Sequence, residues 1–310
     1  MAVVRTVLGD VTAEVLGVTY LHEHLIIDAP LVADRMPHIS LPSVSEAAAE
    51  VATCAAAGVG AMVDAMPCAS GRSAEKLAAV SRATGVHVVA ATGLHTAKYY
   101  APHPWTRSEP AEVLADLFTA DMTEGIDRYD YTGPVVRRGE HRAGIVKVAT
   151  LGEQPTDAER RAFEAAALTV ARTGAPLLTH CEGGRGGVAQ VALLAELGVP
   201  LPRVILSHTD KQPDPGYHRE LLDAGVNLEY DQGLREPDRT LGLLRAMLDE
   251  GFAGQLLLGT DGARRSLWRT LGGAPGLAWL AEHLPLEPAV RHTLFVTNPA
   301  RVLALANASG

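Results

Sequence analysis

Short apolar runs alternate with longer amphipathic stretches along the whole 310-residue chain. The runs are rich in valine, isoleucine and leucine, which is typical of parallel strands that are buried on both faces. Turn-forming or polar residues bound each of them. We therefore expect eight strands, at residues 19–25, 60–65, 86–93, 144–150, 176–180, 204–208, 226–230 and 255–261.

The stretches between these runs carry helix start and stop signals. Ser43 or Ser45 can cap a helix over residues 44–57, and Thr156 with Glu159 forms a capping box for a helix that ends at Gly174. Further helices are expected at 73–84, 111–123 and 188–197, and two more should end at Gly225 and Gly251.

Eight alternations of strand and helix predict an α/β protein whose parallel sheet is covered by helices. Eight units favour a closed (β/α)8 TIM barrel, with residues 1–310 as a single domain. The alternative is a doubly wound open sheet, although the G-x-G-x-x-G turn that often follows its first strand is absent. Residues 3–18 contain Gly9-Asp10 and predict a short N-terminal β-hairpin that plugs or covers one barrel end.

Composition narrows the range of partners. The formal net charge is −9, the chain is 47% hydrophobic and 20% charged, and no run of basic residues is present. A nucleic-acid surface and a membrane-binding helix are therefore not expected, and small molecules are the expected partners. The N-terminus lacks a signal-peptide pattern, so we expect a cytoplasmic protein. Three widely spaced cysteines indicate neither a disulfide framework nor a thiolate zinc site.

Side chains that can bind metal stand at the ends of five expected strands. His22 and His24 point to the same face of the first strand, because strand side chains alternate. The carboxyl ends of all strands meet at one face of a barrel, so the later residues should join this pair. Each of them alone could be an ordinary polar residue. Together they predict a metal site made of His22, His24, Lys147, His180, His208 and Asp261.

Lys147 is unusual in this set, because an ammonium group repels metal ions. A desolvated amine loses its proton more readily, and the neutral amine can add carbon dioxide. The resulting carbamate, N6-carboxylysine, is an anionic ligand with two oxygens that can bridge two cations. An ordinary pair between Lys147 and a carboxylate is the structural alternative.

The order H-x-H, Lys, His, His, Asp resembles that of the binuclear amidohydrolase superfamily. Local sequences between Val7 and Arg301 are similar to those of its phosphotriesterase family, at 21–24, 71–73 with 80–83, 88–94 and 143–150. The resemblance implies a homodimer and two metal ions. It places one ion among His22, His24, carboxylated Lys147 and Asp261, and a more exposed one among His180, His208 and the same carbamate.

Two positions depart from the family pattern. Ser73 stands where an acidic residue or asparagine is common, and His95 stands where organophosphate-cleaving members carry a tryptophan.

Cations and phenols on three loops would suit an anionic group such as phosphate. This resembles the branch that opens phosphorylated sugar lactones, with solvated loop charges as the alternative. The expected substrate-binding residues are His95, Lys98, Tyr99, Tyr100, Lys211, Arg264 and Arg265.

These features predict a metal-dependent hydrolase that opens a lactone by attack of a hydroxide bridging the two metals. Asp261 is the expected catalytic residue, which accepts the proton, and His95 or Asp210 is expected to orient substrate or ligands. Zinc, manganese or cobalt would fit the ligands. The alternatives are a phosphotriesterase or acyl-homoserine-lactone lactonase in the same site, and a metal- or ligand-binding barrel without catalysis. A nucleophile pair of His180 and Cys181 is disfavoured, because adjacent strand residues point to opposite faces.

Overall fold

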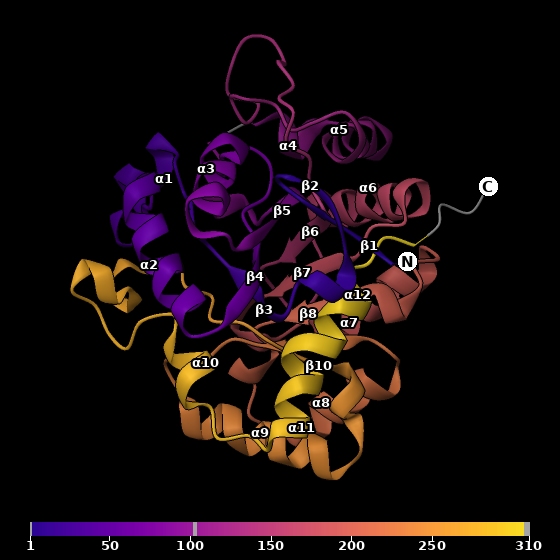
Figure 1. Cartoon of the computed structure of the whole chain (residues 1–310). Coiled ribbons are helices and arrows are strands. Elements are labelled where there is room, and N and C mark those ends of the chain that lie inside the picture. The colour runs from indigo at the N-terminus through magenta and orange to yellow at the C-terminus, as the bar shows by residue number, and fades with distance from the viewer. Residues whose placement is uncertain (1, 102–103, 307–310) are drawn as a thin grey trace.

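The computed structural model describes residues 2–101 and 104–306. Eight parallel strands pair in chain order and form a barrel, with helices around its outside (Figure 1). The ring closes where Asp261, just after the last strand, donates its backbone N–H to the carbonyl of His22 in the first at 2.9 Å. The predicted (β/α)8 TIM barrel is confirmed. Its strands are β3 (Val18–Glu23), β4 (Val59–Asp64), β5 (His87–Gly93), β6 (Ile145–Thr150), β7 (Leu177–Cys181), β8 (Val204–Ser207), β9 (Asn227–Tyr230) and β10 (Leu256–Leu258).

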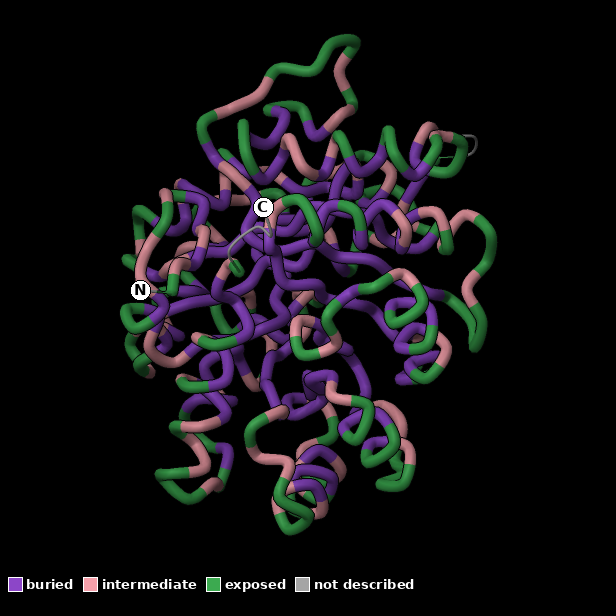
Figure 2. The backbone as a smooth tube through the Cα atoms, turned by 90° about the vertical axis from the view of Figure 1, so that its right-hand side faces the viewer, coloured by how far each residue is buried: buried purple, intermediate pink, exposed green. Residues whose placement is uncertain are grey.

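Helices cover the barrel, and the exposed residues, green in Figure 2, lie toward the outside of the molecule. Ser43 and Thr156 cap the helices that the sequence assigned to them, and the capping box with Glu159 is present. Ser73, the departure from the family pattern, accepts a hydrogen bond from Lys76 N and caps its helix. The helices are α1 (Pro30–Arg35), α2 (Val44–Ala56), α3 (Ala74–Thr84), α4 (Trp105–Ser108), α5 (Ala111–Thr123), α6 (Asp157–Thr173), α7 (Gly187–Glu196), α8 (Pro215–Asp223), α9 (Pro237–Asp249), α10 (Trp279–His283), α11 (Pro288–His292) and α12 (Asn298–Leu303).

None of the helices in the described ranges combines the length and the apolar character that crossing a membrane requires.

The predicted N-terminal hairpin is formed by β1 (Val3–Thr6) and β2 (Gly9–Thr12), which pair antiparallel. Val4 packs in one apolar cluster with inward-facing residues of the barrel strands, and Val7 donates its N–H to the carbonyl of Val88 at 2.8 Å. Val302 and Leu303 of α12 belong to the same cluster. The hairpin therefore plugs the end of the barrel at which the strands begin, and leaves the opposite end free for a site.

Val4→Ala tests this plug. The Val4 side chain is fully buried, and its truncation removes two methyl groups from a packed cluster. We expect the free energy of unfolding to fall by about 1 to 3 kcal/mol. Val113→Ala is the matched control, because Val113 is 47% exposed on α5 and should change stability by less than about 0.5 kcal/mol. Equal stability of the two variants in urea unfolding would show that the hairpin is not part of the core.

Candidate metal centre

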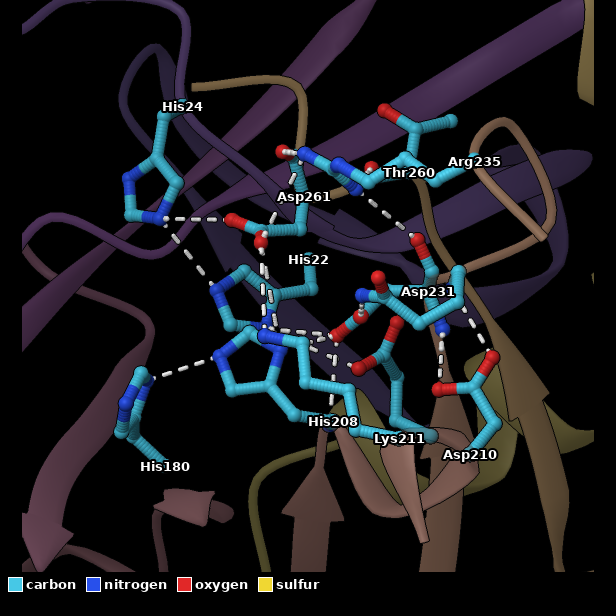
Figure 3. Close-up of polar contacts among 12 residues, drawn as sticks. His22, His24, His180, His208, Asp210, Lys211, Asp231, Arg235, Thr260 and Asp261 are labelled. Atoms are coloured by element: carbon cyan, nitrogen blue, oxygen red, sulfur yellow. Dashed lines mark hydrogen bonds and ion pairs between the residues drawn. The ribbon is translucent and has the colours of Figure 1, made fainter. Parts of the chain in front are cut away.

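The six predicted ligands meet at the carboxyl ends of the strands (Figure 3 labels five of them). His22 lies on β3 with His24 directly after it, Lys147 lies on β6 and His180 on β7. The other two, His208 and Asp261, follow β8 and β10. Barrel closure thus gathers residues that are up to 239 positions apart in the chain (22 to 261).

One group of donor atoms surrounds His22. Its Nε2 lies 3.3 Å from His24 Nε2 and 3.1 Å from Lys147 Nζ. Asp261 Oδ1 lies 3.6 Å from His24 Nε2. His22, His24 and Asp261 offer ligand atoms that all lie within 4.8 Å of one another, a spacing that suits a metal ion. This is the set that the family resemblance assigns to the more buried metal.

A second group of candidate ligands lies beside the first. His180 Nδ1 and His208 Nε2 are 2.7 Å apart. Asp261 extends between the two groups, because its Oδ2 lies 4.0 Å from His208 Nδ1 while its Oδ1 faces His24. The family resemblance assigns His180 and His208 to the more exposed metal. The structure brings the two rings together, as that assignment requires.

The backbone is strained at two of these residues. His208 has φ of 64° and Asp261 has φ of 44°, both in the left-handed region that residues with a Cβ rarely adopt. The strand predicted to reach residue 208 accordingly ends at Ser207, and the strand predicted to reach 261 ends at Leu258. Such strain persists only where the surrounding structure imposes it, and it is concentrated at functional sites.

Burial keeps the imidazoles neutral. Desolvation lowers the pKa of His24 to about 3 and that of His180 to about 4, and it holds the pKa of His22 and His208 well below the usual value. Each ring therefore has one nitrogen lone pair to share at neutral pH. The Nε2 atoms of His22 and His24 face each other at 3.3 Å in a buried site, a separation at which one cation can bind both nitrogens. The donor set therefore fits divalent metal ions.

Lys147 is fully buried, and burial lowers its pKa to about 8. Among the described residues, no carboxylate oxygen lies within 4.0 Å of its Nζ, and its closest polar partner is His22 Nε2. The alternative of an ordinary lysine–carboxylate pair is therefore not what the structure shows. A buried amine without a counterion, which releases its proton near neutral pH, has the properties that carbamate formation needs. Carboxylation itself stays a prediction.

Two buried acids behind the histidines were not predicted from the sequence. Asp231 Oδ2 lies 2.5 Å from His208 Nδ1, and Glu229 Oε2 lies 3.6 Å from His22 Nδ1. A carboxylate as close to the far nitrogen of a candidate ligand histidine as Asp231 is to His208 can orient the ring, whereas Glu229 lies beyond hydrogen-bonding distance of His22. The signal in the sequence was Glu229, an acidic residue inside an otherwise buried strand.

Asp210, which the sequence suggested as an orienting residue, acts indirectly. Its carboxylate accepts hydrogen bonds from the backbone N–H groups of Asp231 and Gln232 and from the hydroxyl of Thr240. It therefore holds the backbone that carries Asp231, and Asp231 in turn contacts His208.

An open cavity lies over the candidate metal ligands. Five of the predicted substrate-binding residues line it: His95, Lys98, Tyr99, Lys211 and Arg264. His95 also packs against a metal ligand, since its ring centroid is 4.8 Å from that of His180. Apolar side chains also line the cavity, among them Ile27, Met36, Ile39 and Met66.

Two predicted substrate-binding residues, Tyr100 and Arg265, are not among the residues that line this cavity. The Tyr100 hydroxyl accepts a hydrogen bond from His95 N and donates one to Cys68 O, so this buried side chain anchors the loop from below. Arg265 turns away and pairs with Glu46 of α2 at 3.0 Å. Tyr100 and Arg265 therefore bind partners outside the cavity.

Arg235 and Glu182 line the cavity and were not predicted as site residues. Arg235 donates to the backbone carbonyls of Thr260 at 3.0 Å and Asp261 at 2.6 Å, and so holds the strained turn that presents the Asp261 carboxylate. The sequence carries no signal for Arg235, because this residue lies in a loop outside any regular pattern. Glu182 stands two residues after His180, a spacing that places both side chains on one face of a strand.

Comparisons with known proteins agree with this geometry. The model of the phosphotriesterase family matches residues 2–300. The chain belongs to the phosphotriesterase family. A protein of Mycoplasmopsis synoviae named phospho-furanose lactonase is 32% identical over 322 residues, which cover 97% of this chain and 91% of that protein. The aryldialkylphosphatase of Saccharolobus solfataricus is 26% identical, over 79% of this chain and 77% of its own length.

A solved structure is also similar to this member of the phosphotriesterase family. The crystal structure of an amidohydrolase from Mycoplasma synoviae superposes with a TM-score of 0.94 at 28% identity, and the match covers 99% of this chain and 93% of the other. The phosphotriesterase family consists of binuclear metal-dependent hydrolases, and the candidate ligands described above are present in this member. The protein is therefore a hydrolase that acts on ester bonds.

Proposed function

We propose that this hydrolase opens a phosphorylated sugar lactone by cleaving the ester bond of its ring. The relative named phospho-furanose lactonase, at 32% identity over nearly the full chain, supports this substrate class. The cationic side of the cavity supports it independently. A neutral phosphotriester or an acyl-homoserine lactone is the alternative substrate. The relative named aryldialkylphosphatase and the apolar side chains that line the cavity support this alternative.

The proposal depends on which basic side chains of the cavity are already paired with a carboxylate. Lys98 is paired with Glu182, and Lys211 and Arg235 lie within 4.0 Å of Asp261 Oδ2. Arg264 is exposed, and within the described part of the chain no carboxylate oxygen lies within 4.0 Å of its guanidinium. A phosphate group can therefore pair with Arg264 without breaking an existing ion pair, and arginine binds phosphate oxygens in a bidentate manner.

The metal ions of this proposal are two divalent cations, and the mixed nitrogen and oxygen ligands fit zinc, with manganese or cobalt as alternatives. When bound, such a pair lowers the pKa of water between its members and polarises the substrate carbonyl. We propose that Lys147 holds both cations as N6-carboxylysine, which supplies negative charge where its unpaired amine now lies. The other residues that would hold them are His22, His24, His180, His208 and Asp261.

Asp261 is the proposed catalytic residue. Its two oxygens face the two groups of histidines, so its carboxylate lies beside any water that attacks from between them. Asp261 then accepts the proton of this water and passes it to the leaving alkoxide of the opened ring. Arg235 keeps the carboxylate in place by binding the carbonyl of the same residue, and Lys211 lies 3.9 Å from its Oδ2.

Arg264→Gln tests the proposed substrate. A hydrogen bond to a charged group contributes about 1.5 to 3 kcal/mol, so kcat/KM for a phosphorylated furanose lactone should fall by about 10- to 100-fold. For the same lactone without phosphate, kcat/KM should stay within about twofold of wild type. Steady-state kinetics on the two lactones measure both changes.

Arg265→Gln is the matched control, because it removes the neighbouring charge, which contacts Glu46 outside the cavity. The preference for the phosphorylated lactone should be the same in this variant as in wild type. The proposal fails if wild type hydrolyses both lactones equally well and Arg264→Gln changes neither. Faster turnover of a phosphotriester or of an acyl-homoserine lactone than of either sugar lactone would favour the alternative.

A further inference from the structure

Glu182 makes a direct contact with a metal ligand. It begins the 3-10 turn η4 (Glu182–Gly184) after β7, and its Oε2 accepts a hydrogen bond from His180 Nε2 at 2.9 Å. The turn is packed closely on the other ligand of this group. Gly184 has φ of 76°, and a Cβ there would lie 2.9 Å from the carbonyl oxygen of His208. The position of Glu182 is therefore set by the same backbone that carries both histidines.

This contact selects one tautomer of His180. A neutral imidazole has one protonated and one unprotonated nitrogen, and the carboxylate takes the proton-bearing one. Nε2 of His180 therefore carries the proton, and the lone pair is on Nδ1, which faces His208 Nε2 at 2.7 Å. Without the carboxylate, the ring is free to place its proton on Nδ1, and that tautomer cannot bind a metal ion through Nδ1, the nitrogen that faces His208.

The same carboxylate oxygen holds the loop that covers the cavity. Lys98, in the 3-10 turn η3 (Ala97–Tyr99) after β5, donates to Glu182 Oε2 at 2.9 Å. The loop reaches His180 by a second route, because His95 packs its ring 4.8 Å from that of His180 and 3.9 Å from that of Tyr99. Residues 95–99, which we call the covering segment, thus contact His180 both directly and through Glu182.

The pair of Lys98 and Glu182 adds little to the stability of the fold. Their side chains are 39% and 36% exposed, and ion pairs that are this open to solvent contribute about 0 to 1 kcal/mol. Removing either charge should therefore leave the protein folded. What the pair changes is the local order of the covering segment and of the His180 ring.

We propose that Glu182 is a positioning residue that couples the covering segment to the metal position at His180 and His208. A cation at this position fixes His180, and through Glu182 and Lys98 it orders residues 95–99. By reciprocity, an ordered covering segment strengthens the hold on the cation. The proposal rests on the proposed function in one respect, namely that a cation binds between His180 and His208.

The first measurement is metal release from the holoenzyme to a chromophoric chelator. In Glu182→Ala, one of the two cations should be lost about 10- to 100-fold more readily than in wild type, as is usual when the hydrogen-bond partner of a ligand histidine is removed. Glu182→Gln should retain most of the affinity, because its amide oxygen can still accept the His180 Nε2 proton. Lys98→Met should retain it within a few fold.

The second measurement is amide hydrogen exchange of residues 94–100 in the holoenzyme and after chelation. In wild type, chelation should speed exchange in this segment. In Glu182→Ala and Lys98→Met, chelation should change exchange much less than in wild type, because only the direct contact between the rings of His95 and His180 still joins the segment to the metal ligand. A role in general stability alone would move the unfolding temperature and would not remove this dependence on metal.

Glu250→Ala is the matched control, since Glu250 pairs with Arg219 between the outer helices α8 and α9. It should match wild type in both measurements. The proposal is overturned if Glu182→Ala releases metal at the wild-type rate, or if chelation leaves exchange of residues 94–100 in wild type unchanged. Neither measurement uses a substrate, so both remain readable if the enzyme hydrolyses no sugar lactone.

Discussion

Asp261→Asn is expected to lower kcat for ester hydrolysis by about 10²- to 10⁴-fold, the usual contribution of a positioned proton acceptor. Asparagine keeps the size of the side chain and one oxygen, but it cannot accept the proton of the attacking water. The effect should appear in kcat, because the wall and the cations of the cavity are unchanged. Steady-state kinetics at saturating substrate measure it, with metal content determined on the same sample.

Asp116→Asn is the control for this substitution, because Asp116 pairs with Arg172 at 2.8 Å on the outer faces of α5 and α6. It should hydrolyse the substrate at the wild-type rate. If Asp261→Asn with two bound metal ions kept the wild-type kcat, another group would have to accept the proton, and the role given to Asp261 would be wrong.

Lys147→Met is expected to remove most bound metal and to lower kcat/KM by at least about 10³-fold. Methionine is close to lysine in length and is apolar, so it fits the fully buried position, but it can neither carry a carbamate nor bridge two cations. Bound cations supply several kcal/mol of transition-state stabilisation, and each 1.36 kcal/mol corresponds to a tenfold change in rate. Elemental analysis and steady-state kinetics of the purified variant measure both losses.

The metal-free form of Lys147→Met should be at least as stable as metal-free wild type, because a buried amine without a carboxylate partner is costly. Thermal unfolding of the two chelated proteins compares them. Native mass spectrometry of wild type should further show the added mass of one carbon dioxide, which is lost on denaturation. A Lys147→Met protein that holds two metal ions and retains activity would exclude the carbamate as their shared ligand.

The convergence of the candidate metal ligands was predictable from sequence because backbone topology alone brings them together. His22, Lys147 and His180 stand on strands, and the closure of eight parallel strands places their ends at one face whatever the loops do. The helices were predictable for a similar reason, since caps such as Thr156 and stops such as Gly174 act within a few residues.

The substrate-binding residues were only partly predictable, because loop side chains take whichever partner is nearest. Arg264 and Arg265 are neighbours of the same type, yet one reaches the cavity and the other pairs with Glu46 on α2. Tyr100 binds Cys68 O, a partner 32 residues away in the chain that no local pattern reveals. Arg235 was missed for the same reason, since its role depends on three-dimensional proximity to the Asp261 turn.

The buried acid on β9, Glu229, could be interpreted only in part from the sequence. Glu229 inside an apolar strand marks an inward-facing charge, but the residue that it faces, His22, follows only from the register of the closed barrel. Sequence thus indicates that such a carboxylate needs a partner, and the fold identifies that partner.

Crystallography of the metal-loaded protein with anomalous scattering at the absorption edge of the metal tests the central claim most directly. We expect two peaks per chain, one among His22, His24, Lys147 and Asp261 and the other between His180 and His208, with density for a carbamate joining Lys147 to both. Fully active protein whose crystals show no metal at these residues would contradict the account.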